Sequence, residues 1–281
     1  MTKVRTIELP GALPLTIHES GERGDDGHAV LVLHAGSGPR TIAGFSESLS
    51  QHAYVITPTH PGFDGTPRPD GLDTVADLAS AYMDLLDALD LTGVTVIGNS
   101  VGGWIASEMA LRDNHGRISA LVLINAVGIH ARKQENRVVD VRTINPADLG
   151  KLSFADEAFR PDFASFTDEQ RAAAAANQQT LAVYGGEHFV FDPKLRARLH
   201  RVSVPVLVVW GEQDGIAPLG YGRGYAGAFP NGRFAPIPGA GHFPQIEQAG
   251  ATLAAITGFV EHPEFIEHNL VKRDAVVGGA A

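Results

Sequence analysis

The stretch Gly93-Val-Thr-Val-Ile-Gly-Asn-Ser100-Val-Gly-Gly-Trp104 runs from β-branched residues into a cluster of glycines around one serine, and then into a helical pattern. Glycine weakens both strands and helices because it loses more conformational entropy on folding than other residues. Its repeated use here predicts a sharp strand-to-helix turn that only small side chains permit. Residues 98–102 match the pattern Gly-x-Ser-x-Gly, in which such a turn raises the serine hydroxyl above the edge of a sheet.

This turn predicts a nucleophile at Ser100 and a hydrogen-bond donor at the backbone amide of Val101. The amide is expected at a helix N-terminus, where unpaired N–H groups and the helix dipole stabilise developing negative charge. The alternative for the pentapeptide alone is a glycine-rich turn that carries no chemistry. The rest of the chain therefore has to supply a base for the serine.

A serine hydroxyl is a poor nucleophile at neutral pH and needs a histidine that a carboxylate orients. Both residue types occur on predicted loops in the last third of the chain. Asp214 closely follows an apolar strand, and His242 lies in a glycine-rich loop before a helix predicted for 245–260. The order Ser, Asp, His is the one expected for this turn in an open α/β sheet. Glu212 is the alternative acid, whereas Asn125 cannot ionise and does not compete.

Apolar runs of strand length alternate with longer helical patterns, as expected for βαβ units around a mostly parallel sheet. Their nearly continuous Val, Ile and Leu content predicts that helices cover both faces of the sheet. The predicted elements are buried strands over 29–34, 54–57, 94–98, 120–125 and 204–210, a hairpin over 5–19 and an amphipathic helix over 74–91.

The alternation stops between residues 128 and 201, where the sequence becomes charged and alanine-rich. Thr167 and Gln170 form a capping-box pattern ahead of an alanine-rich helix that Gly185 and Gly186 end. We therefore predict a core domain of residues 1–128 and 202–281, into which residues 129–201 are inserted as a helical lid. Ordinary connecting helices are the alternative interpretation.

Composition restricts the class of partner. The 281 residues, 44% of them hydrophobic, suffice for one large domain. The formal net charge of −10, without a basic run, argues against nucleic acid and membranes and favours a small-molecule substrate. The sequence contains no cysteine, no long apolar N-terminal segment and no cluster of metal ligands. We therefore expect a cytoplasmic protein, monomeric or homodimeric, that binds no metal.

Several motifs resemble those of the α/β-hydrolase family and follow the order of that family. They are HAGSG at 34–38, PGFDGT at 61–66, GNSVGG at 98–103, and WGEQD at 210–214 paired with GAGHF at 239–243. The resemblance implies an α/β fold with an eight-stranded, mostly parallel sheet, helices on both faces and a helical lid inserted after strand 6. It also implies a catalytic triad of Ser100, His242 and Asp214 that works without a cofactor.

The same resemblance implies an oxyanion hole formed by the backbone amides of Gly36 and Val101. Ala35 stands where the family usually has glycine, which leaves Ser37 as the alternative to Gly36. His34, at the start of this loop, is expected to hold the loop in place rather than to react.

Further residues near the expected site are candidates for substrate binding. Ser37 and His60 lie on loops at the same sheet edge, and Arg40 could pair with a substrate carboxylate. Phe63 and Phe243 could line an apolar pocket, although packing in the core is the alternative for both. The aromatic residues available to the predicted lid are Phe154, Phe159, Phe163, Phe166, Tyr184, Phe189 and Phe191.

The main functional hypothesis is a carboxylesterase-like serine hydrolase that cleaves a small, largely apolar carboxylic ester or lactone through an acyl-enzyme. The first alternative is a C–C bond hydrolase of the meta-cleavage type, whose glycine-rich loop the residues HAGSGP resemble. The second is a ligand-binding protein that keeps the triad but turns over slowly. Residues 262–281 are interpreted either as a loose end or as an oligomer contact.

Overall fold

The computed structural model describes residues 2–24 and 28–261. The C-terminal residues 262–281, for which the sequence leaves two interpretations, lie outside the described residues.

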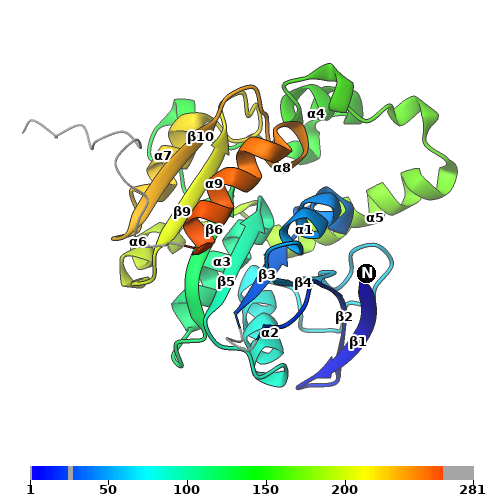
Figure 1. The fold of residues 1–281 in the computed structure, drawn as a ribbon. Coiled ribbons are helices and arrows are strands. Elements are labelled where there is room, and N and C mark those ends of the chain that lie inside the picture. Colours follow the sequence, from blue (N-terminus) through cyan, green and yellow to red (C-terminus); the bar gives the residue numbers. More distant parts are fainter. Residues whose placement is uncertain (1, 25–27, 262–281) are drawn as a thin grey trace, which may run out of the picture.

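The described residues form one main sheet of eight strands in the order β1-β2-β4-β3-β5-β6-β9-β10 (Figure 1). β1 pairs antiparallel with β2, and β2 pairs antiparallel with β4. All later neighbours pair parallel, which confirms the predicted mostly parallel sheet and its N-terminal hairpin. The strands are β1 Lys3–Leu9, β2 Leu13–Ser20, β3 Ala29–Leu33, β4 Tyr54–Pro58, β5 Val94–Asn99, β6 Ile118–Ile124, β9 Val206–Gly211 and β10 Gly232–Ile237.

Helices cover both faces of this sheet (Figure 1). On one face, α1 (Ala43–Leu49) and α9 (Ala249–Glu261) pack over Val30, Val32 and their neighbours. On the other face, α2 (Val75–Ala88), α3 (Val101–Arg112) and α7 (Leu219–Ala226) pack over Leu31, Leu33 and their neighbours. Alternate residues of one strand therefore enter opposite cores, which explains why the strands are apolar throughout.

The helix predicted for 245–260 is interrupted. The structure has a short α8 (Pro244–Glu247) and then α9, separated by Gln248 with φ −130° and ψ 53°. The apolar pattern continues on both sides of Gln248, so periodicity alone could not reveal a break of one residue.

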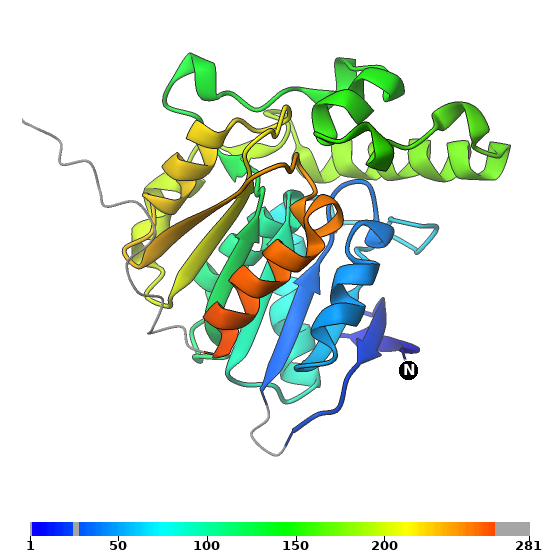
Figure 2. The ribbon, with the colours of Figure 1, turned by 45° about the horizontal axis from the view of Figure 1, so that its top comes forward.

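The chain between β6 and β9 is mostly helical and runs over one end of the sheet (Figure 2). It contains α4 (Pro146–Ser153) and α5 (Asp168–Gly185), whose first turn carries the predicted capping box of Thr167 and Gln170. α5 is held over the loop after β4, because Thr180 and Tyr184 donate hydrogen bonds to the carbonyls of Gly62 and Pro61, both at 2.9 Å. The remaining elements are the 3-10 turns Gln134–Asn136, Val141–Thr143, Glu157–Phe159, Phe163–Ser165 and Leu199–Arg201, the strands β7 Gly128–Ile129 and β8 Phe191–Asp192, and α6 Leu195–Arg198.

The sequence pattern did not reveal two features of this segment. β7 and β8 form a separate two-stranded parallel sheet. Leu195 and Leu199 are fully buried in the main core, so the last turns of the segment pack against the core instead of over the sheet end. None of the helices in the described part of the chain has both the length and the hydropathy needed to cross a bilayer.

Candidate active site

Ser100 lies in the tight turn between β5 and α3, as the sequence predicts. Its backbone has φ 55° and ψ −116°, a conformation that residues other than glycine rarely adopt. A Cβ atom on Gly98 would lie 2.2 Å from the carbonyl oxygen of Gly102, and one on Gly102 would lie 2.3 Å from that of Leu33. The glycines are therefore required by the close approach of backbone to backbone, and they allow Ser100 to stand at the end of the sheet.

The loops after β9 and β10 bring a carboxylate and an imidazole together. His242 Nδ1 lies 2.8 Å from Asp214 Oδ2. Asp214 Oδ1 accepts hydrogen bonds from the backbone amides of Ile216 at 2.8 Å and Ala217 at 3.0 Å. Because the carboxylate accepts all of these bonds, Nδ1 must carry the imidazole proton, which leaves Nε2 available as a base. His242 and Ser100 border the same cavity.

Asn125 also belongs to this site. From the sequence it was considered only as a residue that cannot replace Asp214 as the acid. Its side-chain amide donates to Asp214 Oδ2 at 2.7 Å, the same oxygen that His242 contacts. Its carbonyl oxygen accepts from the backbone amide of Gly211 at 3.1 Å. The signal was present in the sequence, because Asn125 directly follows a strand that neighbours the strand before Asp214 in a parallel sheet.

The proposed oxyanion donors lie around the same cavity. Gly36, Ser37 and Val101 all border it, and Gly36 and Val101 are buried whereas Ser37 is exposed. Within the described residues, none of their backbone amides donates a hydrogen bond to another protein group. These amides therefore remain available to an oxygen atom of a ligand.

A stacked pair of histidines supports the loop that carries Gly36. The rings of His34 and His60 lie 3.7 Å apart, and both are fully buried. His34 Nδ1 donates to the Ala35 carbonyl, and Nε2 accepts from the His60 amide. His60 Nε2 donates to the His34 carbonyl, and its Nδ1 accepts from the Tyr82 hydroxyl. Each neutral tautomer is thus fixed by its partners.

Burial lowers the pKa of His34 to about 4, and burial followed by the neighbouring His34 lowers the pKa of His60 well below its usual 6.5. The cause is that neither ring can reach water to solvate an imidazolium ion. The sequence-based expectation that His60 contacts substrate is therefore replaced by a supporting position beneath the loop.

The other predicted binding residues divide into two groups. Phe243 and Ser37 border the cavity. Phe63 does not, because its ring is 1% exposed and packs against Tyr184 and the two histidines, so it belongs to the core. Arg40 is exposed and is not among the residues that line the cavity.

The cavity beside Ser100 has a volume of about 60 Å³. The segment between β6 and β9 contributes aliphatic side chains to it, and none of the seven aromatic residues considered for the lid takes part. Sequence reasoning missed these residues, although the valines at 138, 139 and 141 were a possible signal. They are Val138, Val139, Val141, Leu149, Leu181 and Val190.

Backbone hydrogen bonds attach the same segment to the loops that carry Asp214 and His242. The carbonyl of Ser153 accepts from the amide of His242 at 2.7 Å, and the carbonyl of Leu152 accepts from the amide of Gly215 at 2.9 Å. The buried carboxylate of Glu247 accepts from the amide of Gly241 at 2.6 Å and from that of Asp156 at 2.9 Å. The position of His242 therefore depends on the inserted segment as well as on the sheet.

The described residues contain no cluster of three or more His, Cys, Asp or Glu side chains that could hold a metal ion. Ser100, His242 and the free amides instead resemble the parts needed for acyl transfer, in which a nucleophile, a base and oxyanion donors surround one carbonyl.

Residues 30–256 match the alpha/beta hydrolase family. Over 133 residues the chain is 36% identical to 2-hydroxy-6-oxo-2,4-heptadienoate hydrolase of Pseudomonas putida, covering 45% of this chain but only 46% of that enzyme. It is 26% identical to pimeloyl-[acyl-carrier protein] methyl ester esterase of Chromobacterium violaceum, covering 82% and 91% of the two chains. The meta-cleavage product hydrolase from Pseudomonas fluorescens has a similar fold, with a TM-score of 0.74, 21% identity and 92% and 98% coverage.

Proposed function

The chain belongs to the alpha/beta hydrolase family, and we propose that it is a serine hydrolase that cleaves a small, largely apolar carboxylic ester or lactone through an acyl-enzyme on Ser100. The observation that carries the proposal is the hydrogen bond of 2.8 Å between His242 Nδ1 and Asp214, beside a cavity that also contains Ser100 and free backbone amides.

In the proposed mechanism, Ser100 Oγ attacks the carbonyl carbon while His242 Nε2 takes the hydroxyl proton. The amides of Gly36 and Val101 stabilise the negative charge that develops on the carbonyl oxygen. His242 then gives its proton to the departing alkoxide. Water then attacks the acyl-enzyme in the same way, with His242 as the base, which releases the acid and restores Ser100. Asp214 remains ionised and holds the imidazole in its orientation.

The lining of the cavity at Ser100 favours a neutral, apolar group beside the ester carbonyl. In the described part of the chain, no lysine or arginine borders it. A carboxylate enclosed there would lose its hydration without gaining a cation. The aliphatic side chains instead favour a short apolar acyl or alkyl group.

The C–C hydrolase alternative is supported by relatives named as hydrolases of dienoates, among them the enzyme from Pseudomonas putida. Both reactions use the same serine and histidine, so the triad cannot distinguish between them. The substrate decides, because an ester is cleaved at a C–O bond and a dienoate at a C–C bond.

Intact-protein mass spectrometry after exposure to a fluorophosphonate tests the proposal. We expect one adduct on the unsubstituted protein and none on Ser100→Ala. Turnover of p-nitrophenyl acetate is then compared with that of a 2-hydroxy-6-oxo dienoate. Ester turnover that Ser100→Ala retains would refute the proposal. Faster consumption of the dienoate would replace it with the C–C alternative. Binding without turnover of either would favour the slow ligand-binding protein.

A further inference from the structure

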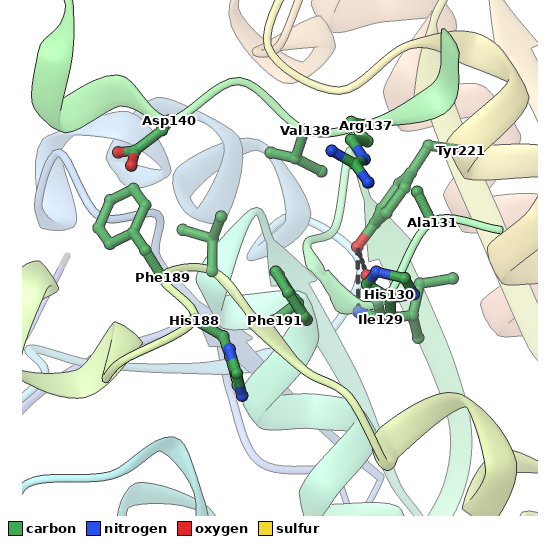
Figure 3. A pocket seen from close by; sticks show the side chains of 11 residues that line it. Ile129, His130, Ala131, Arg137, Val138, Asp140, His188, Phe189, Phe191 and Tyr221 are labelled. Carbon is green, nitrogen blue, oxygen red and sulfur yellow. Dashed lines mark hydrogen bonds between the residues drawn. The ribbon is translucent and has the colours of Figure 1, made fainter. Parts of the chain in front are cut away.

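A second cavity of about 290 Å³ lies beside the one that Ser100 borders. Figure 3 shows the side chains that line it. We call it the distal chamber and define it by Ile129, Ala131, Val138, Phe189, Val190 and Phe191, with Arg137 also on its wall. The hydroxyl of Tyr221 contacts the backbone amide and carbonyl of Ile129 at 3.0 and 2.8 Å, so its polar atom is already paired. His130, Asp140 and His188 also line the chamber, so an apolar body is bordered by several polar groups.

The two cavities share a wall. Val138 and Val190 border both the cavity at Ser100 and the distal chamber. The cavity at Ser100, at about 60 Å³, is far smaller than the ~300–1,000 Å³ typical of small-molecule sites. A substrate of ordinary size must therefore extend past Ser100, and the distal chamber is the space that lies next to it.

The backbone of the shared wall is strained. Phe189 has φ 39° and Val190 has φ 58°, in the left-handed region that β-branched residues avoid. The guanidinium of Arg142 lies 4.3 Å from the centre of the Phe189 ring and packs over it. Strained backbone of this kind clusters at active sites, ligand clamps and switch regions.

The distal chamber also has an unpaired cation. Arg137 is exposed to solvent, and within the described residues its guanidinium forms no hydrogen bond or ion pair. Asp140 borders the same chamber, but its carboxylate already pairs with Arg142 at 2.6 Å. Figure 3 shows Arg137 on the side of the chamber next to Tyr221. An anion that reached this side would meet a positive charge that no protein carboxylate neutralises.

We propose that the distal chamber binds the far end of the acyl chain and that Arg137 recognises a carboxylate there. The substrate would then be a half-ester of an aliphatic dicarboxylic acid. Its ester carbonyl lies at Ser100, its methylene groups pass Val138 and Val190, and its free acid pairs with Arg137. This assignment rests on the proposed esterase function. A dienoate also has a carbonyl and a carboxylate at opposite ends, so it serves as the comparison ligand.

Calorimetry with the Ser100→Ala protein separates binding from turnover. Monomethyl suberate is compared with dimethyl suberate, which has the same chain but no charge. We expect the half-ester to bind about tenfold more tightly, as one charged hydrogen-bonded pair allows. Arg137→Gln should abolish this preference. Arg132→Gln, at an exposed position nearby in the chain, is the control and should leave the preference intact. Equal binding of the two ligands, or equal effects of both substitutions, would overturn the role of Arg137.

A second experiment tests the chamber by filling it. Ala131→Phe adds a ring to its wall, and Ala197→Phe adds the same ring at an exposed position on α6 outside the chamber. We expect Ala131→Phe to lower kcat/KM for p-nitrophenyl octanoate relative to the acetate by about tenfold or more, because the long chain loses its space. Ala197→Phe should leave that ratio unchanged. An unchanged ratio in Ala131→Phe would exclude the chamber as the site of the chain.

The outcomes keep this inference separate from the proposed function. Failure to hydrolyse any ester, with half-ester binding that still depends on Arg137, would reject the esterase and retain the chamber. If the protein consumes the dienoate and this activity depends on Arg137, the chamber would instead bind the carboxylate of a substrate that is cleaved at a C–C bond. Ester hydrolysis with no effect of chain length or charge would retain the esterase and reject the chamber.

Discussion

Asn125 donates its side-chain amide to Asp214 Oδ2 at 2.7 Å, on the oxygen that also contacts His242. The acid of the proposed triad is therefore oriented by two backbone amides on one oxygen and by Asn125 on the other. Asn125 itself is held by the amide of Gly211. This makes Asn125 a positioning residue that acts through Asp214.

Replacing Asn125 tests that relationship. Asn125→Leu removes a hydrogen bond to a charged group, which contributes about 1.5–3 kcal/mol. We expect kcat to fall by about 10- to 100-fold with little change in KM, because the substrate does not contact Asn125. The exposed Asn114, changed in Asn114→Leu, is the control and should retain full kcat. A rise in KM alone would show that Asn125 acts on the substrate instead.

The buried histidine pair predicts how stability depends on pH. The pKa of His34 is lowered to about 4 by burial, and that of His60 is lowered well below 6.5. The unfolded chain takes up these protons near pH 6.5, before the folded chain does. Their stabilising contribution is therefore complete above pH 6.5 and is lost as the pH falls from 6.5 towards 4, by up to about 1.4 kcal/mol per pH unit for each histidine.

Urea unfolding between pH 7.5 and 4.5 measures this slope. His60→Gln should reduce it, since glutamine does not titrate, even though the variant is less stable at every pH. The exposed His52, changed in His52→Gln, should leave the slope as it is. Identical slopes in all three proteins would contradict the assignment of two buried neutral imidazoles.

The tight turn at Ser100 predicts different costs for two glycine substitutions. In Gly102→Ala, the new Cβ atom would lie 2.3 Å from the backbone oxygen of Leu33, so the turn must move. We expect a loss of about 1–3 kcal/mol in the free energy of unfolding, as for overpacking, together with a loss of fluorophosphonate labelling. Gly44→Ala, at an exposed position of α1 with no atom within 4 Å of the new Cβ, should be neutral or stabilise by about 0.5–1 kcal/mol. Similar effects of both changes would reject the steric explanation.

Glu247 connects the His242 loop to the inserted segment. Glu247→Ala leaves the amides of Gly241 and Asp156 without their acceptor, at a cost of about 1–3 kcal/mol for each amide that stays buried. We expect lower stability and a larger fall in kcat than change in KM, because His242 follows Gly241 directly. Glu247→Gln keeps the shape and one carbonyl acceptor, so its effect should be intermediate. If Glu247→Ala had normal stability and kcat, the carboxylate would not hold this loop.

Local patterns in the sequence were sufficient for much of the fold. The turn at Ser100, the apolar strands and the capping box at Thr167 depend on interactions within a few residues, and the structure has all of them. The placement of Asp214 and His242 also followed from local rules, because the carboxyl ends of parallel strands meet at one edge. Their hydrogen bond is the consequence.

Residues whose surroundings come from distant parts of the chain were less predictable. His60 and Phe63 follow a strand as candidate ligand residues do, but they turn inward beneath α5 and α2. Arg40 lies near Gly36 in sequence, yet it is exposed and does not line the cavity. The sequence suggested the aromatic residues of the inserted segment as pocket lining. In the structure, valines and leucines of that segment line the cavity at Ser100 instead.

The sequence by itself determined the sheet, the mostly helical segment after β6 and the loops that carry Ser100, Asp214 and His242, because periodicity, turn chemistry and strand order are short-range properties. Tertiary structure alone decided that Asn125 holds Asp214, that Glu247 and Ser153 anchor the His242 loop, and that two cavities share the wall of Val138 and Val190. These contacts join residues far apart along the chain. Which side chain faces a cavity depends on how whole elements pack, and no local pattern encodes that choice.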